Sequence, residues 1–232
     1  MTFKRLILSQ FVLVLSLGGT ALADDAAVPT AAGLEKAWKP QAGDAIRFNV
    51  LRKGNEFGSH TVTFEAGPNN ALIAKTKVDL KAGLGPITVF RYDLAASETW
   101  RGGELVAVNG RGNDDGKKNS MKATRDGDAL EVQGTEFTGE VPADIIPASH
   151  WNYAQTKASE LLSTENGEVY KVTVTPKGRE TIKAGGKSIA ANRYFMDSNI
   201  DVDVWYDDQG RWVKLAFQAR GQEIEYVLDQ MY

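Results

Sequence analysis

Apolar residues recur at every second position through most of this 232-residue chain. Ile46, Phe48 and Val50 begin the pattern, and clusters of turn-forming residues, such as the Asn-Asp-Asp-Gly run at 113–116, interrupt it at short intervals. A period of two places the apolar side chains of a segment on one face of a β-strand, whereas a helix would need a period near 3.6. The pattern therefore predicts an antiparallel all-β fold of roughly a dozen strands.

The number of predicted strands constrains the shape of the sheet. Twisted open sheets rarely stay flat beyond about ten strands, so a larger sheet curls, closes or splits. Because one face of each strand is apolar and the other is polar, we expect a single large, strongly curved antiparallel sheet, or an open barrel, around the apolar face. A sandwich of two packed sheets is the alternative.

Residues 137–167 interrupt the strand pattern between two β-rich halves. The stretch from Ala154 to Leu162 has the most helical character of the chain after its N-terminal segment. We therefore expect one short crossover helix there. We also expect Trp151, Leu161 and Leu162 to pack against the sheet.

The first 23 residues have the pattern of a secretory signal peptide. Lys4 and Arg5 precede an apolar run at 6–17, and an Ala-Leu-Ala tripeptide that ends at Ala23 provides a small-x-small cleavage site. The run is too short to span a bilayer, which takes roughly 20 apolar residues. We expect cleavage after Ala23, export to the periplasm of a Gram-negative bacterium, and no transmembrane span in the mature chain. A buried N-terminal helix is the alternative.

Composition narrows the function classes for the remaining chain. Residues 24–43 are rich in Ala, Pro and Gly and read as a flexible leader, so residues 44–232 are expected to form a single antiparallel β domain. Removing the signal peptide leaves 25 basic and 30 acidic residues, a mildly acidic balance that argues against nucleic-acid binding. The chain has no cysteine, which excludes disulfides, thiol catalysis and cysteine-based zinc sites. We expect no cofactor and no metal site.

Recognisable catalytic motifs are absent from the sequence. It contains no GxSxG elbow, no HExxH, no Walker loop and no GxGxxG before a helix. His60 and His150 are its two histidines, and either would need a carboxylate or a nucleophile within hydrogen-bond reach to act as a general base. A buried structural role is the ordinary explanation of each. We therefore expect no catalytic residues and a protein that is not an enzyme.

Aromatic residues gather at the ends of two predicted hairpins and on neighbouring strands. Trp100 lies at one hairpin end, and Trp205 and Trp212 lie at the other. Ligand pockets combine apolar walls with a few polar groups, which makes such residues candidates for a binding site, although cross-strand aromatic packing would place them in the same way. The candidate ligand-binding residues are His60, Tyr92, Trp100, Tyr194, Trp205, Trp212 and Arg193.

Several short motifs follow one another in a recognisable order. They include Phe48-Asn49-Val50, the run from Glu98 to Leu105, Trp151-Asn152 and the run from Val202 to Tyr206. Over residues 44–229 the sequence resembles a family of exported bacterial domains of unknown function, domain of unknown function 6134. The resemblance implies an architecture and a compartment, and it implies no activity.

The pattern is also similar to the curled antiparallel sheets of periplasmic lipoprotein carriers, which hold acyl chains in a concave apolar cavity. A likeness between folds does not fix function. We expect an uncharacterised exported β-domain that binds an apolar or amphipathic ligand, such as a lipid, in its curved sheet. Arg91, Arg193 and Arg211 would face an acyl carboxylate or a phosphate if their side chains converge.

Two other functions stay open at this point. The protein could be a non-catalytic envelope scaffold that binds another protein through an exposed strand or an apolar patch. It could also be a hydrolase that uses His60 or His150 with a nearby carboxylate. The structure can distinguish ligand binding from scaffolding. An apolar face that the chain's own side chains fill completely favours a scaffold, and an unfilled face favours a ligand-binding protein.

Overall fold

A computed structural model describes residues 37–84, 87–229 and 232 of the chain. The predicted signal peptide and the first part of the predicted leader lie outside these residues. The described part contains sixteen β-strands and two short 3-10 helices, η1 (Pro68–Asn70) and η2 (Tyr153–Lys157). Within these ranges, no helix is both long enough and apolar enough to cross a membrane.

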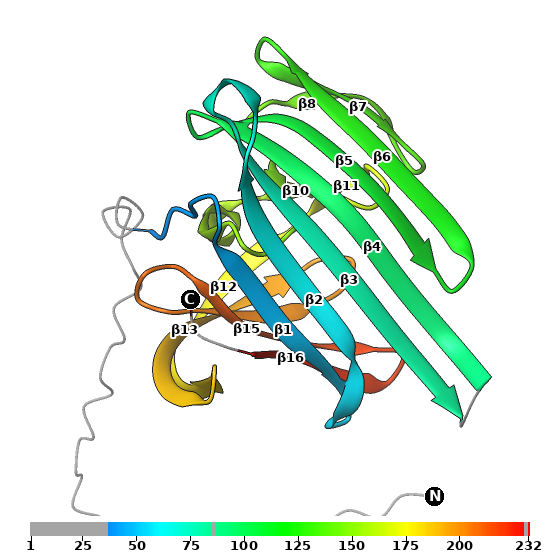
Figure 1. Cartoon of the computed structure of the whole chain (residues 1–232), viewed down its shortest axis with the longest axis vertical. Helices are drawn as coiled ribbons and strands as arrows, with labels where there is room; N and C mark the ends of the chain where they lie inside the picture. Colours follow the sequence, from blue (N-terminus) through cyan, green and yellow to red (C-terminus); the bar gives the residue numbers. More distant parts are fainter. Residues whose placement is uncertain (1–36, 85–86, 230–231) are drawn as a thin grey trace, which may run out of the picture.

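Thirteen of the strands form one large antiparallel sheet (Figure 1). Its order is β12-β13-β14-β15-β16-β1-β2-β3-β4-β5-β6-β7-β8. The bounds of its strands are β1 (Ala45–Arg52), β2 (Asn55–Ala66), β3 (Leu72–Leu84), β4 (Ile87–Arg101), β5 (Glu104–Asp114), β6 (Lys117–Asp126), β7 (Ala129–Gly134), β8 (Thr138–Pro142), β12 (Thr173–Ala184), β13 (Lys187–Asp197), β14 (Val202–Tyr206), β15 (Trp212–Ala219) and β16 (Gln222–Leu228).

The large sheet consists of two meanders joined by the first and last strands. Strands β1–β8 follow one another in sequence, as do β12–β16, and β1 pairs with β16 in the register Phe48↔Leu228 and Val50↔Tyr226. The sheet curves strongly but does not close, because β8 and β12 stand at its two edges (Figure 1). This arrangement confirms the predicted all-β fold built on one large curved antiparallel sheet.

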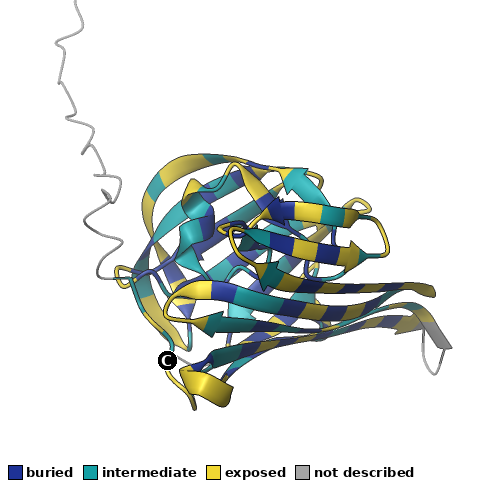
Figure 2. Ribbon diagram, turned by 90° about the horizontal axis from the view of Figure 1, so that it is seen from above, coloured by how far each residue is buried: buried dark blue, intermediate teal, exposed yellow. Residues whose placement is uncertain are grey.

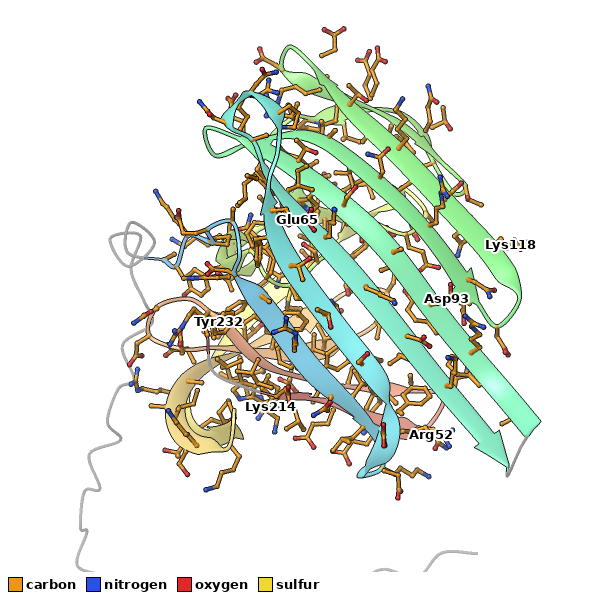
Figure 3. All side chains as sticks on the ribbon, in the orientation of Figure 1. Arg52, Glu65, Asp93, Lys118, Lys214 and Tyr232 are labelled. Carbon is orange, nitrogen blue, oxygen red and sulfur yellow. The ribbon has the colours of Figure 1, made fainter. Side chains whose placement is uncertain are left out.

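Alternation along the strands sorts the side chains onto two faces, and Figure 2 shows buried and exposed residues alternating along the ribbons. Phe48, Val62 and Phe64 on the concave face are at most 1% exposed. The convex face carries charged side chains, among them Glu65 on β2 and Lys118 on β6, which Figure 3 labels. The apolar concave face is buried inside the molecule, while the polar convex face remains in contact with water. Burial of the apolar face provides the main driving force for this fold.

A crossover between β8 and β12 fills the concave face. It contains a small sheet of β9 (Ile146–Pro147), β10 (Glu160–Leu162) and β11 (Val169–Lys171). The crossover approaches β5 and β7 so closely that a Cβ atom on Gly110 would lie 1.7 Å from the backbone oxygen of Thr164, and one on Gly134 would lie 2.2 Å from that of Asn166. Only glycine allows this contact between two backbones.

Strand β10 divides the interior into two apolar cores. Leu161 packs into the larger core, formed mainly by β1–β3 and β12–β16, and Leu162 packs into the smaller core, formed by β5–β8. Trp151 also belongs to the larger core. The expected packing of Trp151, Leu161 and Leu162 against the sheet is therefore confirmed.

The predicted helix from Ala154 to Leu162 is wrong in its extent. The helical turn η2 starts after Asn152, whose side chain accepts a hydrogen bond from the N–H of Ala154, and it ends at Lys157. Residues 160–162 form β10 instead, because they pair with β11 on one side and with β9 on the other. Strand pairing inside the fold overrides a weak local helical preference here.

Candidate functional site

Five of the seven candidate residues point into the interior of the sheet. His60 and Trp212 are in contact there, with ring centroids 5.2 Å apart. Tyr194 packs edge-on against Tyr206 in the larger core. Tyr92 and Trp100 lie on β4; Tyr92 packs against the larger core, and Trp100 packs against both cores.

The other two candidates, Trp205 and Arg193, lie on the convex face. They stand opposite each other on β14 and β13, and the guanidinium of Arg193 lies 5.3 Å from the ring of Trp205. Arg193 makes two hydrogen bonds of 2.8 Å to Asp203. The indole N–H of Trp205 donates to Glu180. These two residues are thus paired with neighbours on the opposite side of the sheet from the other candidates.

The three arginines considered for an anionic ligand do not converge. Arg91 pairs with Asp93 on its own strand at 3.0 Å. Arg211 pairs at 2.7 Å with Asp207, the first residue after β14. Together with the pairing of Arg193, this leaves no shared arginine site for a carboxylate or a phosphate.

Both histidines of the chain pack around Trp212. His60 comes from β2, and the His150 ring lies 5.5 Å from Trp212, although the two histidines are far apart in sequence. Burial, and to a smaller extent repulsion from His150, lower the pKa of His60 to about 3. Burial also lowers the pKa of His150 to about 4, and the side chain of Gln155 acts in the opposite direction. Both imidazoles are therefore neutral at pH 7.

Several polar atoms of the two histidines and of the crossover are buried without a hydrogen-bond partner in the described structure. They are Nδ1 and Nε2 of His60, Nδ1 of His150, Oε1 of Gln155 and Oγ of Ser149. Buried polar groups are normally hydrogen-bonded, and each exception destabilises the fold by about 1–3 kcal/mol.

No hydrogen bond among the described residues joins either histidine side chain to a carboxylate or a hydroxyl. His60 has no hydrogen-bond partner on either ring nitrogen, and Nδ1 of His150 has none, within the described residues. A general base needs a partner at hydrogen-bond distance, so the hydrolase hypothesis gains no support. Over the same part of the chain, no three His, Asp or Glu side chains lie close enough together to hold a metal ion.

A buried carboxyl group lies close to Trp100. Glu98 is 1% exposed and accepts hydrogen bonds from the indole N–H groups of Trp100 at 3.0 Å and Trp151 at 3.1 Å. Burial raises the pKa of Glu98, while Ser149 and the two indoles act in the opposite direction. The Ser149 hydroxyl itself is not in hydrogen-bonding geometry. Sequence reasoning missed Glu98, although alternation from Trp100 places it at an inward position of β4.

A second carboxylate, Glu165, ties the crossover to the sheet. It accepts hydrogen bonds from the hydroxyl of Tyr92 at 2.9 Å and from the amide of Asn119 at 2.6 Å. Burial and this carboxylate both raise the pKa of Tyr92. Tyr92 therefore holds the crossover in place, a role that no sequence spacing indicates.

A pocket of about 480 Å³ opens beside Trp100, where the crossover meets the β4–β5 hairpin. Its lining is Trp100, Gly103, Glu104, Leu105, Arg125, Asp128, Ala143, Asp144, Ile145 and Ile146. Each of the three guanidinium nitrogens of Arg125 donates to a backbone oxygen, that of Leu105 at 2.7 Å, Ala143 at 2.9 Å or Gly127 at 3.2 Å. The pocket thus combines an apolar wall with carboxylates and has the volume typical of small-molecule sites.

Comparison with known proteins identifies a family and a fold. The family model described as Domain of unknown function (DUF6134) matches residues 48–229. No curated protein matches the chain in sequence. A crystal structure of a beta-barrel-like protein of domain of unknown function DUF1849 from Brucella abortus is similar over 80% of this chain and 95% of that one, with a TM-score of 0.59 and 8% identity. At this identity the likeness shows the fold alone.

Proposed function

This chain belongs to the family described as Domain of unknown function (DUF6134), and we propose that it binds a small amphipathic molecule, such as a single-chain lipid, without catalysing a reaction on it. The observation that carries the proposal is the pocket of about 480 Å³ between the crossover and the β4–β5 hairpin. Because the crossover covers the concave face, the ligand would enter at this junction rather than spread over the whole curved sheet.

The pocket lining suits a molecule with two different ends. Trp100, Leu105 and Ile145 offer an apolar wall for a hydrocarbon chain or a ring. Glu104, Asp128 and Asp144 line the same pocket, and ionised carboxylates only accept hydrogen bonds. The polar end of the ligand is therefore a donor, either a hydroxyl or an ammonium group, and not a carboxylate.

The compartment forms part of the same proposal. The N-terminal basic, apolar and small-residue segments of the sequence support export to the periplasm of a Gram-negative bacterium, with cleavage after Ala23. Expression of the full chain in such a host tests this directly. A periplasmic product whose mass starts at Asp24 supports export, and a cytoplasmic product of full mass contradicts it.

Ligand binding is tested with three probes of equal chain length: decylamine, decanol and decanoate. Native mass spectrometry of the purified protein first detects any co-purifying molecule, and tryptophan fluorescence then measures the affinity of each probe. We expect decylamine to bind at least about tenfold more tightly than decanoate. The double variant Glu104→Gln/Asp144→Asn should lose most of this preference, because hydrogen bonds to charged groups contribute about 1.5–3 kcal/mol each.

A matched control separates a local effect from overall charge. Glu131→Gln removes one exposed carboxylate from β7, which lies outside the pocket, and it should leave the preference for decylamine unchanged. Equal binding of decylamine and decanoate by the wild-type protein would contradict the proposal.

One observation favours a different function, that of a scaffold for another envelope protein. The concave face is filled by the chain's own crossover, with Leu161 and Leu162 in the two cores. If the protein carries no co-purifying molecule and binds none of the three probes, scaffolding becomes the better proposal. Crosslinking in the intact envelope would then identify the partner.

A further inference from the structure

We propose that residues 148–158, here called the cover segment, close a second and interior binding site for a flat aromatic molecule that carries one N–H or O–H group. The site lies beneath the cover segment on the concave face. It extends from Trp212 and His60 to the place of the Trp151 indole beside Phe64 and Trp100. It shares the Trp100 ring with the pocket beside the β4–β5 hairpin but none of the carboxylates of that pocket, and it does not depend on ligand binding there.

The first observation is where the unsatisfied polar atoms lie. Of the six buried side-chain atoms without a hydrogen-bond partner in the described residues, five belong to His60, Ser149, His150 and Gln155. Three of these residues are in the cover segment, and His60 is on the strand beneath it. Moving the cover segment away would give all of these atoms access to water or to a ligand, so the closed arrangement is locally unfavourable.

The second observation is the way in which the cover segment is attached. In the described chain, its hydrogen bonds to the large sheet all involve side chains, with Glu98, Tyr194 and Tyr206 as the partners on the sheet. The backbone of His150 has a φ of 62°, a left-handed conformation that is unfavourable for a residue other than glycine and is often found in mobile functional segments. The cover segment is therefore attached to the large sheet by side-chain hydrogen bonds and by the packing of Trp151 and Tyr153, and not by strand pairing within the described residues.

The rest of the crossover is attached much more firmly. Strand β10 pairs through its backbone with both β9 and β11. Residues 164–166 lie directly on glycines of β5 and β7. The cover segment can thus leave the sheet while the small sheet stays in place, because its backbone hydrogen bonds to the small sheet lie at its first two residues, from the N–H of Ala148 to Leu162 and from the N–H of Ser149 to Pro147.

The side chain of Trp151 indicates which molecule would fit in the opened site. Its indole packs edge-on against Phe64 at 5.2 Å and Trp100 at 5.7 Å, and its N–H donates to Glu98. When the cover segment leaves, Glu98 loses a donor and two aromatic rings lose a neighbour. A ligand that replaces Trp151 must therefore be aromatic and must carry an N–H or O–H group.

Hydrogen exchange on the full-length protein, with N-phenyl-1-naphthylamine as the probe, tests the proposal. Without the probe, peptides from residues 148–158 should exchange at least about 100-fold faster than peptides from β10 and β15, because only the cover segment opens locally. Addition of the probe should increase exchange in 148–158 further and leave β2 and β15 protected. Equal protection of 148–158 and β10, or a bound probe that leaves exchange in 148–158 unchanged, would overturn it.

A variant gives a second readout that does not depend on probe chemistry alone. His60→Phe keeps an aromatic ring beside Trp212 and removes both unpaired nitrogens, so the closed state should become more favourable. Exchange in 148–158 should slow by about tenfold, and the affinity for the probe should fall by a similar factor. Faster exchange in His60→Phe, at an unchanged circular dichroism spectrum, would contradict the proposal. Glu104→Gln in the separate pocket should leave probe binding unchanged, which distinguishes the two sites.

Discussion

Acid should destabilise this protein strongly below pH 6.5, because of His60 and His150. Their pKa values in the folded protein are lowered by burial to about 3 and about 4 from an ordinary value of 6.5. Below pH 6.5 the unfolded chain therefore binds protons that the folded protein does not. The stabilising contribution of each neutral histidine is fully present above pH 6.5 and is lost as the pH falls towards the folded pKa.

The size of the effect follows from the same values. Between pH 6.5 and pH 5, each histidine that stays neutral in the fold reduces the free energy of unfolding by about 2 kcal/mol, at 1.36 kcal/mol per pH unit. His60 is 5% exposed and should contribute this full amount. His150 keeps partial exposure and should contribute less. The expected loss is ~3–4 kcal/mol, a large fraction of the 5–15 kcal/mol that stabilises a typical domain.

Urea unfolding followed by the fluorescence of the five tryptophans at pH 7.5 and pH 5.0 measures this loss. The double variant His60→Phe/His150→Asn has no histidine, and asparagine tolerates the left-handed backbone at position 150. Between pH 7.5 and pH 5.0 its free energy of unfolding should fall by less than about 1 kcal/mol, because no histidine is left to take up a proton on unfolding. Glu98 is present in both proteins, so its titration cancels in the comparison. The reasoning is refuted if the wild-type protein loses less than about 1 kcal/mol, or if the double variant loses as much as the wild type.

Three further substitutions test the packing and the paired groups. Gly110→Ala should lower the free energy of unfolding by about 3 kcal/mol or more, because the added Cβ would lie 1.7 Å from a backbone oxygen of the crossover. The control Gly103→Ala has nothing within 4 Å of the added atom but a φ of 89°, and it should lower the free energy of unfolding by only about 1 kcal/mol. Equal effects of the two variants in urea unfolding would count against the close contact. Glu98→Leu should lower the melting temperature, since it leaves two buried indole N–H groups unpaired at about 1–3 kcal/mol each, and an unchanged value would show that they find other partners. Arg193→Ala should lower stability by only about 1 kcal/mol, because its ion pair with Asp203 lies at the surface and is partly accessible to water. It should leave the affinity for decylamine unchanged, and a weaker affinity would show that Arg193 contributes to the binding site.

Part of the candidate site follows from alternation alone. Residue parity from Val62 and Phe64 places His60 on the concave face, where it is 5% exposed. The same parity places Arg193 opposite to Tyr194, and Trp205 opposite to Tyr206, since neighbouring residues of a strand point to different faces. Applied consistently, alternation would have removed Arg193 and Trp205 from the candidate set.

The other part of the site has no counterpart in local sequence. His60 and His150 meet at Trp212 because β2, the crossover and β15 come together in space. Glu165 reaches Tyr92 and Asn119 for the same reason. Such contacts join residues that are many positions apart, and no spacing rule within a strand or turn predicts them.

The sequence by itself determined the class of fold and the faces of the strands, because a period of two acts over neighbouring residues and burial of one face then follows from the hydrophobic effect. Tertiary structure decided the rest. It converted residues 160–162 from a predicted helix into β10 by offering strand partners on both sides. It also placed the crossover inside the curved sheet, where Gly110 and Gly134 make room for it. These outcomes depend on which backbones meet across the fold, and that information lies in long-range packing rather than in any local pattern.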